Sequence, residues 1–237
     1  MVSFGKSLPP QNDDEWTPRD AALLLTVHAV QAALDGDLSR VSRVLVPFAL
    51  QSGQPQERTV ATAPFQLWSW QAMGDGSYYR DQSTYFATGR GAVGFTLGAM
   101  AGRAIGNSYR ARRAAEDAQP RWVPIDHGQV TVSDYGFYLH TLRTVLWWNW
   151  QAISLVQLTA PATVQVLGES ANGPVNWQIV SDVAELIFCY WALVRNRYHP
   201  QLVNGVWLPS DWTQKVERLQ GEHCDSPHET VLRQLNS

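Results

Sequence analysis

Apolar residues recur at helical spacing near the start of the chain and at every second position further on, so the sequence predicts a helical front and a strand-rich back. Thr17-Pro18-Arg19-Asp20 supplies an N-cap hydroxyl, a proline at the first helical position and an acid in the first turn. An apolar stripe follows, and Gly36 provides a stop. We therefore predict a helix from residue 17 to 35 and a second over residues 37–45, which together form a helical hairpin.

The strand-like period is clearest from residue 122 onward. Residues 130–133 and 137–140 alternate around Asp134-Tyr135-Gly136, which predicts a β-hairpin. Further strands are predicted over residues 65–70, 78–88, 146–150, 153–158, 163–167 and 176–180, with a loop at 168–174. On the last two of these strands, the inward positions are Val164, Val166, Trp177 and Ile179.

One more helix is predicted after the strands. Ser181 is its expected cap and Asp182 its leading residue, and residues 183–194 are apolar on nearly every side. Arg195, Arg197 and His199-Pro200 end it with basic residues and a proline. A helix this apolar must be buried.

A polar stretch with glycine and proline, residues 51–58, is the best candidate for a linker. It divides the sequence into an N-terminal helical segment (1–55), a β-rich domain (56–202) and a C-terminal tail (203–237). Because the β-rich domain contains its own closing helix, we expect it to fold without the N-terminal helices.

A glycine-rich stretch interrupts the strand pattern. Gly94, Gly98, Gly102 and Gly106 recur at every fourth position and would form a stripe without side chains on a helix of about residues 91–118. Each glycine costs a helix interior about 1 kcal/mol relative to alanine, so the stripe indicates close packing against another backbone or a flat surface.

Three interpretations of this stretch remain open. A membrane span is disfavoured by its length, since a bilayer core needs about 20 apolar residues, and by Arg103. A dinucleotide site is suggested by Gly89, Gly91 and Gly94, but the acids Glu116 and Asp117 fall in a helical segment rather than after a second parallel strand. The third interpretation, a structural helix that packs on its own sheet or on a second copy, is favoured.

Composition changes this picture mainly through the distribution of charge. The chain has 237 residues, 45% of them apolar, and a formal net charge of −3, so it can bury a sizeable core. Its arginines gather beside the glycine stripe, at Arg103, Arg110, Arg112, Arg113 and Arg121. A local basic patch is compatible with an anionic partner such as lipid or nucleic acid, although a solvated helix end is the commoner explanation of such a patch. Tryptophans also cluster, at Trp68, Trp70, Trp147, Trp148 and Trp150.

The sequence carries no motif for catalysis. It has no G-x-S-x-G, H-E-x-x-H, P-loop or C-x-x-C pattern, and His223, Cys224 and His228 lie in a polar segment that offers no fourth metal ligand. Cys189 and Cys224 are unsuited to pairing, and the N-terminus lacks the apolar core of a secretory signal. We expect a cytoplasmic protein without cofactor or metal.

A tryptophan-led meander of short antiparallel strands followed by one capping helix resembles the pleckstrin-homology-like (PH-like) superfold, and most nearly its bacterial GRAM-type variants. The resemblance rests on Trp122, residues 128–133, 137–139 and 150–153, and Trp177-Gln178-Ile179 leading into the helix. It implies a non-enzymatic module that docks a lipid headgroup or a peptide. The early basic hairpin of phosphoinositide-binding members is absent from this sequence.

Together, these patterns predict an α+β protein: a helical hairpin, then a PH-like antiparallel β-barrel with an inserted glycine-rich helix and a C-terminal capping helix. The expected function is peripheral association with anionic lipid through the five arginines, with nearby aromatic residues as interfacial anchors. The alternative is a protein-interaction module that forms a homodimer through the glycine stripe, and a dinucleotide-binding enzyme is a distant third. Nucleic acid is not the expected partner.

Overall fold

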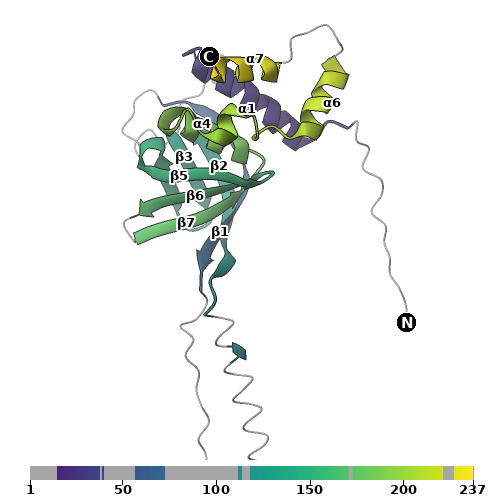
Figure 1. Ribbon diagram of the computed structural model, residues 1–237. Coiled ribbons are helices and arrows are strands. Elements are labelled where there is room, and N and C mark those ends of the chain that lie inside the picture. The colour runs from purple at the N-terminus through teal and green to yellow at the C-terminus, as the bar shows by residue number, and fades with distance from the viewer. Residues whose placement is uncertain are drawn as a thin grey trace, which may run out of the picture. The chain divides into compact units, whose positions relative to one another are not determined.

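The computed structural model describes residues 15–37, 39, 57–72, 112–113, 118–170, 173–220 and 227–236 (Figure 1). The chain divides into two compact units. One comprises residues 1–67 and 126–237, and the other comprises residues 68–125.

The described residues form five α-helices and seven strands. The helices are α1 (Pro18–Leu34), α4 (Ala184–Arg195), α5 (Pro200–Val203), α6 (Ser210–Gln220) and α7 (Pro227–Leu235). The strands are β1 (Thr59–Gln71), β2 (Arg121–Ser133), β3 (Gly136–Thr141), β4 (Val145–Asn149), β5 (Ile153–Ala160), β6 (Thr163–Ser170) and β7 (Gly173–Val180), and a short 3₁₀ helix, η2 (Trp150–Ala152), joins β4 to β5.

All seven strands belong to one antiparallel sheet of order β4-β3-β2-β1-β7-β6-β5. The α+β class is therefore confirmed, but the sheet is open and no closed barrel is formed. Its two end strands, β4 and β5, are joined by only the three residues of η2. Because so short a connection links opposite ends of the strand order, the sheet must roll until these ends approach each other. Figure 1 shows β5, β6 and β7 passing in front of β2 and β3.

Helix α1 begins as the sequence predicts. The Thr17 hydroxyl accepts a hydrogen bond from the Asp20 backbone N–H, and the Asp20 carboxylate accepts one from the Thr17 N–H at 2.8 Å, which completes a capping box. The chain leaves the helix at Gly36, whose φ of 71° is readily adopted only by glycine. Both predicted ends of the first helix are confirmed.

Helix α4 is buried, as its composition requires, from Ala184 through Ala192. It packs against β5, β6 and α1, and the Trp191 indole N–H donates to the Ile153 carbonyl at 3.2 Å. The predicted cap was wrong, because the N-cap residue is Val183, which has no side-chain cap bond. The Ser181 hydroxyl is instead directed to β1, where it donates to the Pro64 carbonyl at 2.8 Å.

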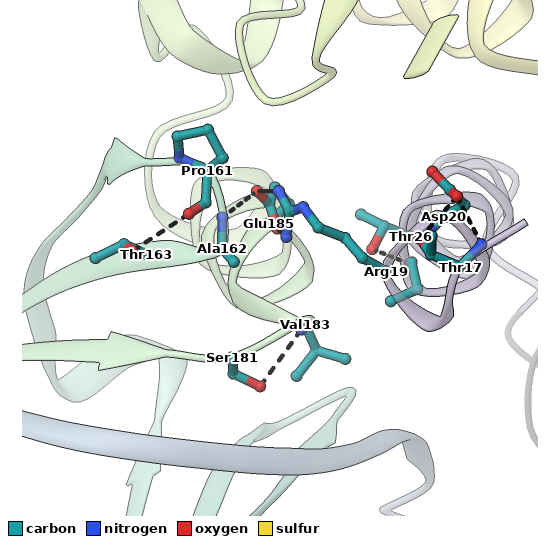
Figure 2. Close-up of polar contacts among 11 residues, drawn as sticks. Thr17, Arg19, Asp20, Thr26, Pro161, Ala162, Thr163, Ser181, Val183 and Glu185 are labelled. Carbon is teal, nitrogen blue, oxygen red and sulfur yellow. Dashed lines mark hydrogen bonds and ion pairs between the residues drawn. The ribbon is translucent and has the colours of Figure 1, made fainter. Parts of the chain in front are cut away.

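An ion pair joins α1 to α4 (Figure 2). The Arg19 guanidinium donates to the Glu185 carboxylate at 2.6 Å, and the same carboxylate oxygen accepts the Ala162 backbone N–H at 2.9 Å. Ala162 lies in the β5–β6 turn at φ 57°. Glu185, whose side chain is only 2% exposed, thus ties the first turn of α4 to both α1 and the sheet.

The segment expected as a C-terminal tail, residues 203–237, contains two helices, α6 and α7. Four of its side chains, Trp212 and Val216 on α6 and Val231 and Leu235 on α7, enter the main hydrophobic core. Each pair is separated by four residues and faces one side of its helix. Only three apolar residues in each helix leave the segment polar on average, which is why the sequence pattern indicated a tail.

The predicted loop at 168–174 was also wrong. The β6–β7 ladder continues through it, with Gly168 opposite Val175, Glu169 opposite Pro174 and Ser170 opposite Gly173. Glycine, serine and proline usually mark loops, but here they occupy the end of a hairpin whose strands extend beyond their apolar core.

Several predictions fall on residues outside the described part of the chain. These are the second helix of the hairpin apart from Asp37 and Ser39, the strand over 78–88 and, apart from Arg112, Arg113 and Ala118, the helix over 91–118. Of the predicted linker, Glu57 and Arg58 are described, and Glu57 is buried. Among the described residues, no helix has the length and apolar character needed to cross a membrane.

Candidate functional site

The predicted anion-contact residues are described only in part. Arg112, Arg113 and Arg121 are exposed, and the first two have helical backbone conformation. Arg103 and Arg110 lie outside the described residues, as do all four glycines of the stripe and the glycines of the dinucleotide motif. The structure therefore leaves the geometry of the complete arginine cluster untested.

Large apolar side chains lie at the strand ends in the unit of residues 68–125, and one of them is the sequence neighbour of Arg121. Trp70, at the end of β1, is 46% exposed, and its ring meets that of Trp122 edge to face with centroids 5.4 Å apart. Trp122 follows Arg121 at the start of β2, and Ile125 on the same strand is 43% exposed. Trp70, Trp122 and Ile125 thus share with Arg121 one short stretch of the two strands that flank the glycine-rich segment.

A buried carboxylate fastens the β2–β3 turn. Glu57 accepts hydrogen bonds from the Tyr138 hydroxyl, at 2.8 and 2.7 Å to its two oxygens, and from the Ser133 hydroxyl. Burial, together with the negative charge of Glu57, raises the pKa of Asp134 in the turn, although the Arg58 N–H that bonds to it acts in the opposite direction. We interpret this cluster as structural, because each of these hydroxyls has an intramolecular partner.

A second buried pair joins α1 to α6. The Lys215 ammonium donates to the Asp20 carboxylate at 2.8 Å, and the Trp212 indole N–H donates to the Asp20 carbonyl. Burial acts to raise the pKa of Asp20, but the hydrogen bonds from Lys215 and Thr17 outweigh it and lower the pKa. This cluster also holds helices together, and the described residues contain no group of histidine, cysteine and acidic residues that could hold a metal ion.

A cavity of about 490 Å³ occupies the seam where the two ends of the rolled sheet approach each other. Strand β4 supplies one wall, and the end of β6 together with Trp177 from the middle of β7 supplies the other. Its lining includes three tryptophans, Trp147, Trp148 and Trp177, and one charged residue, Glu169. Strand β5 begins opposite Gly168, so Glu169 and Ser170 extend past the end of that neighbouring strand.

The tryptophan rings of this seam cavity are held in place by packing. Trp148 and Trp177 meet edge to face, with centroids 5.7 Å apart and ring planes at 75°. Gly168 makes room for this pair, since a Cβ there would lie 2.4 Å from Cζ3 of Trp148. Trp148 is 7% exposed, whereas Trp147, its neighbour on β4, is 42% exposed.

Comparison of the chain with protein-family models, curated proteins and solved structures finds no match.

The cluster of tryptophans at 147–150 was the one sign of the seam cavity in the sequence, and nothing there indicated that Trp177 and Glu169 would join it. Trp177 on β7 and Glu169 on β6 lie on neighbouring strands, but neither strand is a neighbour of β4, which carries Trp147 and Trp148. Only the roll of the sheet brings them together, and Glu169 was assigned to a loop. A local pattern could not reveal the combination.

Proposed function

We propose that the protein is a non-enzymatic module that associates peripherally with anionic membrane surfaces. The observation that carries this proposal is the exposed Trp70, which packs against the half-buried Trp122 next to Arg121, with Arg112 and Arg113 exposed in the same unit. Tryptophan favours the membrane–water interface because its ring is apolar and its N–H is polar. Arginines near an anionic surface contribute about 1 kcal/mol each.

We also propose that the sheet and α4 form a PH-like arrangement of the GRAM type. The order of elements supports this proposal: seven antiparallel strands precede a buried helix that packs against β5 and β6. The chain between β1 and β2 carries the glycine stripe and four of the five arginines, and Arg121 is the first residue of β2. In this proposal the sheet serves as a scaffold for that insertion.

Vesicle co-sedimentation of variants tests the membrane proposal. Replacing Arg110, Arg112 and Arg113 together by glutamine removes about 3 kcal/mol of attraction, which is a loss of more than a hundredfold in affinity for anionic vesicles. Trp70→Ala should also weaken binding, because it removes an interfacial anchor. Tyr198→Ala is the matched control, since Tyr198 is an aromatic residue that is 84% exposed and lies after α4.

The same measurements separate this function from its alternative. If both the triple arginine variant and Trp70→Ala bind anionic vesicles as the unmodified chain does, the membrane proposal is wrong. Light scattering that shows a dimer, together with its loss in Gly98→Leu and Gly102→Leu, would then favour self-assembly through the glycine stripe.

A further inference from the structure

We infer that the seam cavity binds a small organic cation with a quaternary ammonium group. This site is separate from the proposed membrane-contact residues, since every residue that lines it belongs to the unit of residues 1–67 and 126–237. The inference rests on the shape of the cavity, its aromatic walls and its charge.

The first argument is the chemistry of the walls. The faces of tryptophan rings attract cations more strongly than those of other aromatic side chains, and groups of aromatic rings are used to bind quaternary ammonium ions. Trp147, Trp148 and Trp177 all line the cavity, and the steep angle between the Trp148 and Trp177 rings gives it two differently oriented walls. A methylated ammonium ion suits such walls because it is weakly hydrated and cannot donate hydrogen bonds.

The second argument is electrostatic. Glu169 is the one charged side chain among the residues that line the cavity, and it forms no ion pair with any described residue. A carboxylate beside aromatic rings attracts a cation and repels an anion. It also disfavours phosphocholine, whose phosphate would approach Glu169, so the favoured ligand is a simple cation such as choline.

The third argument is that the cavity is built into the fold. Gly168 clears the space for Trp148, and Trp148 and Trp177 belong to or pack against the hydrophobic core. The rings are therefore already positioned before a ligand arrives, which reduces the entropy lost on binding. The volume of about 490 Å³ lies within the range of small-molecule pockets.

Isothermal titration calorimetry on the full chain tests the inference with matched ligands. Choline and tetramethylammonium should bind saturably. The neutral analogue 3,3-dimethyl-1-butanol, which has the shape of choline but a carbon in place of the charged nitrogen, should bind at least about tenfold more weakly, because it lacks the cation–π and carboxylate attraction. Phosphocholine should also bind more weakly than choline.

Matched variants locate the site. Glu169→Gln removes the charge at nearly constant shape, and Trp147→Leu removes a ring that is half-exposed, so both should keep the melting temperature of the unmodified chain. Each should weaken choline binding about tenfold. Trp70→Leu, at a tryptophan of similar exposure outside the cavity, should leave choline binding unchanged.

Three results would overturn the inference. These are the absence of binding by choline and tetramethylammonium at millimolar concentration, equal affinity for choline and its neutral analogue, and unchanged choline affinity in both Glu169→Gln and Trp147→Leu. Failure of this test leaves vesicle binding unaffected, because the two proposals use different residues.

Discussion

At Gly168 the fold depends on the absence of a single methyl group. A Cβ on this residue would lie 2.4 Å from Cζ3 and 2.9 Å from Cη2 of Trp148, a ring that is packed against Trp177 and has little freedom to move. Contacts this short cannot persist, so either the ring or β6 must shift. The position therefore links sheet packing to the seam cavity.

We predict that Gly168→Ala destabilises the protein by about 1–3 kcal/mol, the usual cost of overpacking. Urea unfolding measures the change. Trp148→Phe removes the outer ring that carries the two clashing atoms, so Gly168→Ala should cost less in that background. Equal stability of Gly168→Ala and the unmodified chain would show that the ring can move aside freely.

His199, at the start of α5, is expected to make the stability of the folded protein depend on pH. Its Nδ1 accepts the Gln201 backbone N–H at 3.2 Å, and its ring contacts Phe188 and Trp191 with centroids 5.1 and 6.0 Å away. Burial lowers the pKa of His199 below its usual value. Protonation would also remove the acceptor that caps the helix, so both effects favour the neutral ring.

The unfolded chain therefore takes up a proton at His199 more readily than the folded protein. The stability contribution is complete above a pH of about 6.5, the pKa of an unperturbed histidine, and is lost as the pH falls through the lower folded-state pKa. Melting temperatures between pH 7.5 and 5.5 should fall less steeply in His199→Asn, because asparagine can still cap the helix but does not titrate. Identical pH slopes would assign the dependence to other groups, among them His140, whose pKa is also lowered by burial.

At the scale of elements, the Arg19–Glu185 pair holds α1 against α4. Removing one partner of a buried ion pair leaves the other without compensation, which costs about 3–5 kcal/mol. Arg19 is 25% exposed, so we expect Arg19→Met to fall near the lower end of that range. Adding Glu185→Gln should restore part of the loss, since the amide oxygen can still accept the Ala162 N–H.

Urea unfolding of the two single variants and the double variant forms a complete cycle for this pair. If the double variant is less stable than Arg19→Met, the buried charge is not the source of the loss, and the loss must come from packing of the arginine stem.

The elements that could be predicted from sequence are those specified by neighbouring residues. The capping box of α1 needs only Thr17 and Asp20, and the β2–β3 hairpin needs only the alternation on both sides of its turn. The Ser181 cap failed because a distant strand, through the Pro64 carbonyl, competes for the hydroxyl. The loop at 168–174 failed because pairing with β7 overrides the turn preferences of its residues.

The seam cavity could not be predicted, since its walls come from strands at or near opposite ends of the sheet. Trp147 and Trp148 stood out in the sequence as a cluster, but the approach of Trp177 and Glu169 depends on how far the sheet rolls. The hydrophobic core also joins residues that are far apart in the sequence. Leu23 of α1, Trp212 of α6 and Val231 of α7 belong to the same core as the strands.

On the scale of the whole molecule, this shared core argues against the expectation that residues 56–202 fold alone. Leu23, Val27 and Val30 of α1 are all buried, and burying three such side chains stabilises a protein by roughly 5–9 kcal/mol, comparable with the total stability of many domains. We predict that a fragment of residues 56–202 shows no cooperative thermal transition by circular dichroism. Deletion of residues 1–14, which keeps α1 and its cap, is the control.

A cooperative transition of that fragment within a few degrees of the full chain would contradict the prediction. It would show that the helices around α4 are accessories rather than part of the core.

The central claim, association with anionic membranes, is tested most directly by co-sedimentation of the unmodified full-length chain with vesicles of graded anionic content. We predict binding that increases with the anionic fraction at low salt and weakens as the Debye length shortens from about 10 Å at 0.1 M to about 3 Å at 1 M salt. Binding that is absent from strongly anionic vesicles at low salt, or that is unchanged between 0.1 and 1 M salt, would contradict the account.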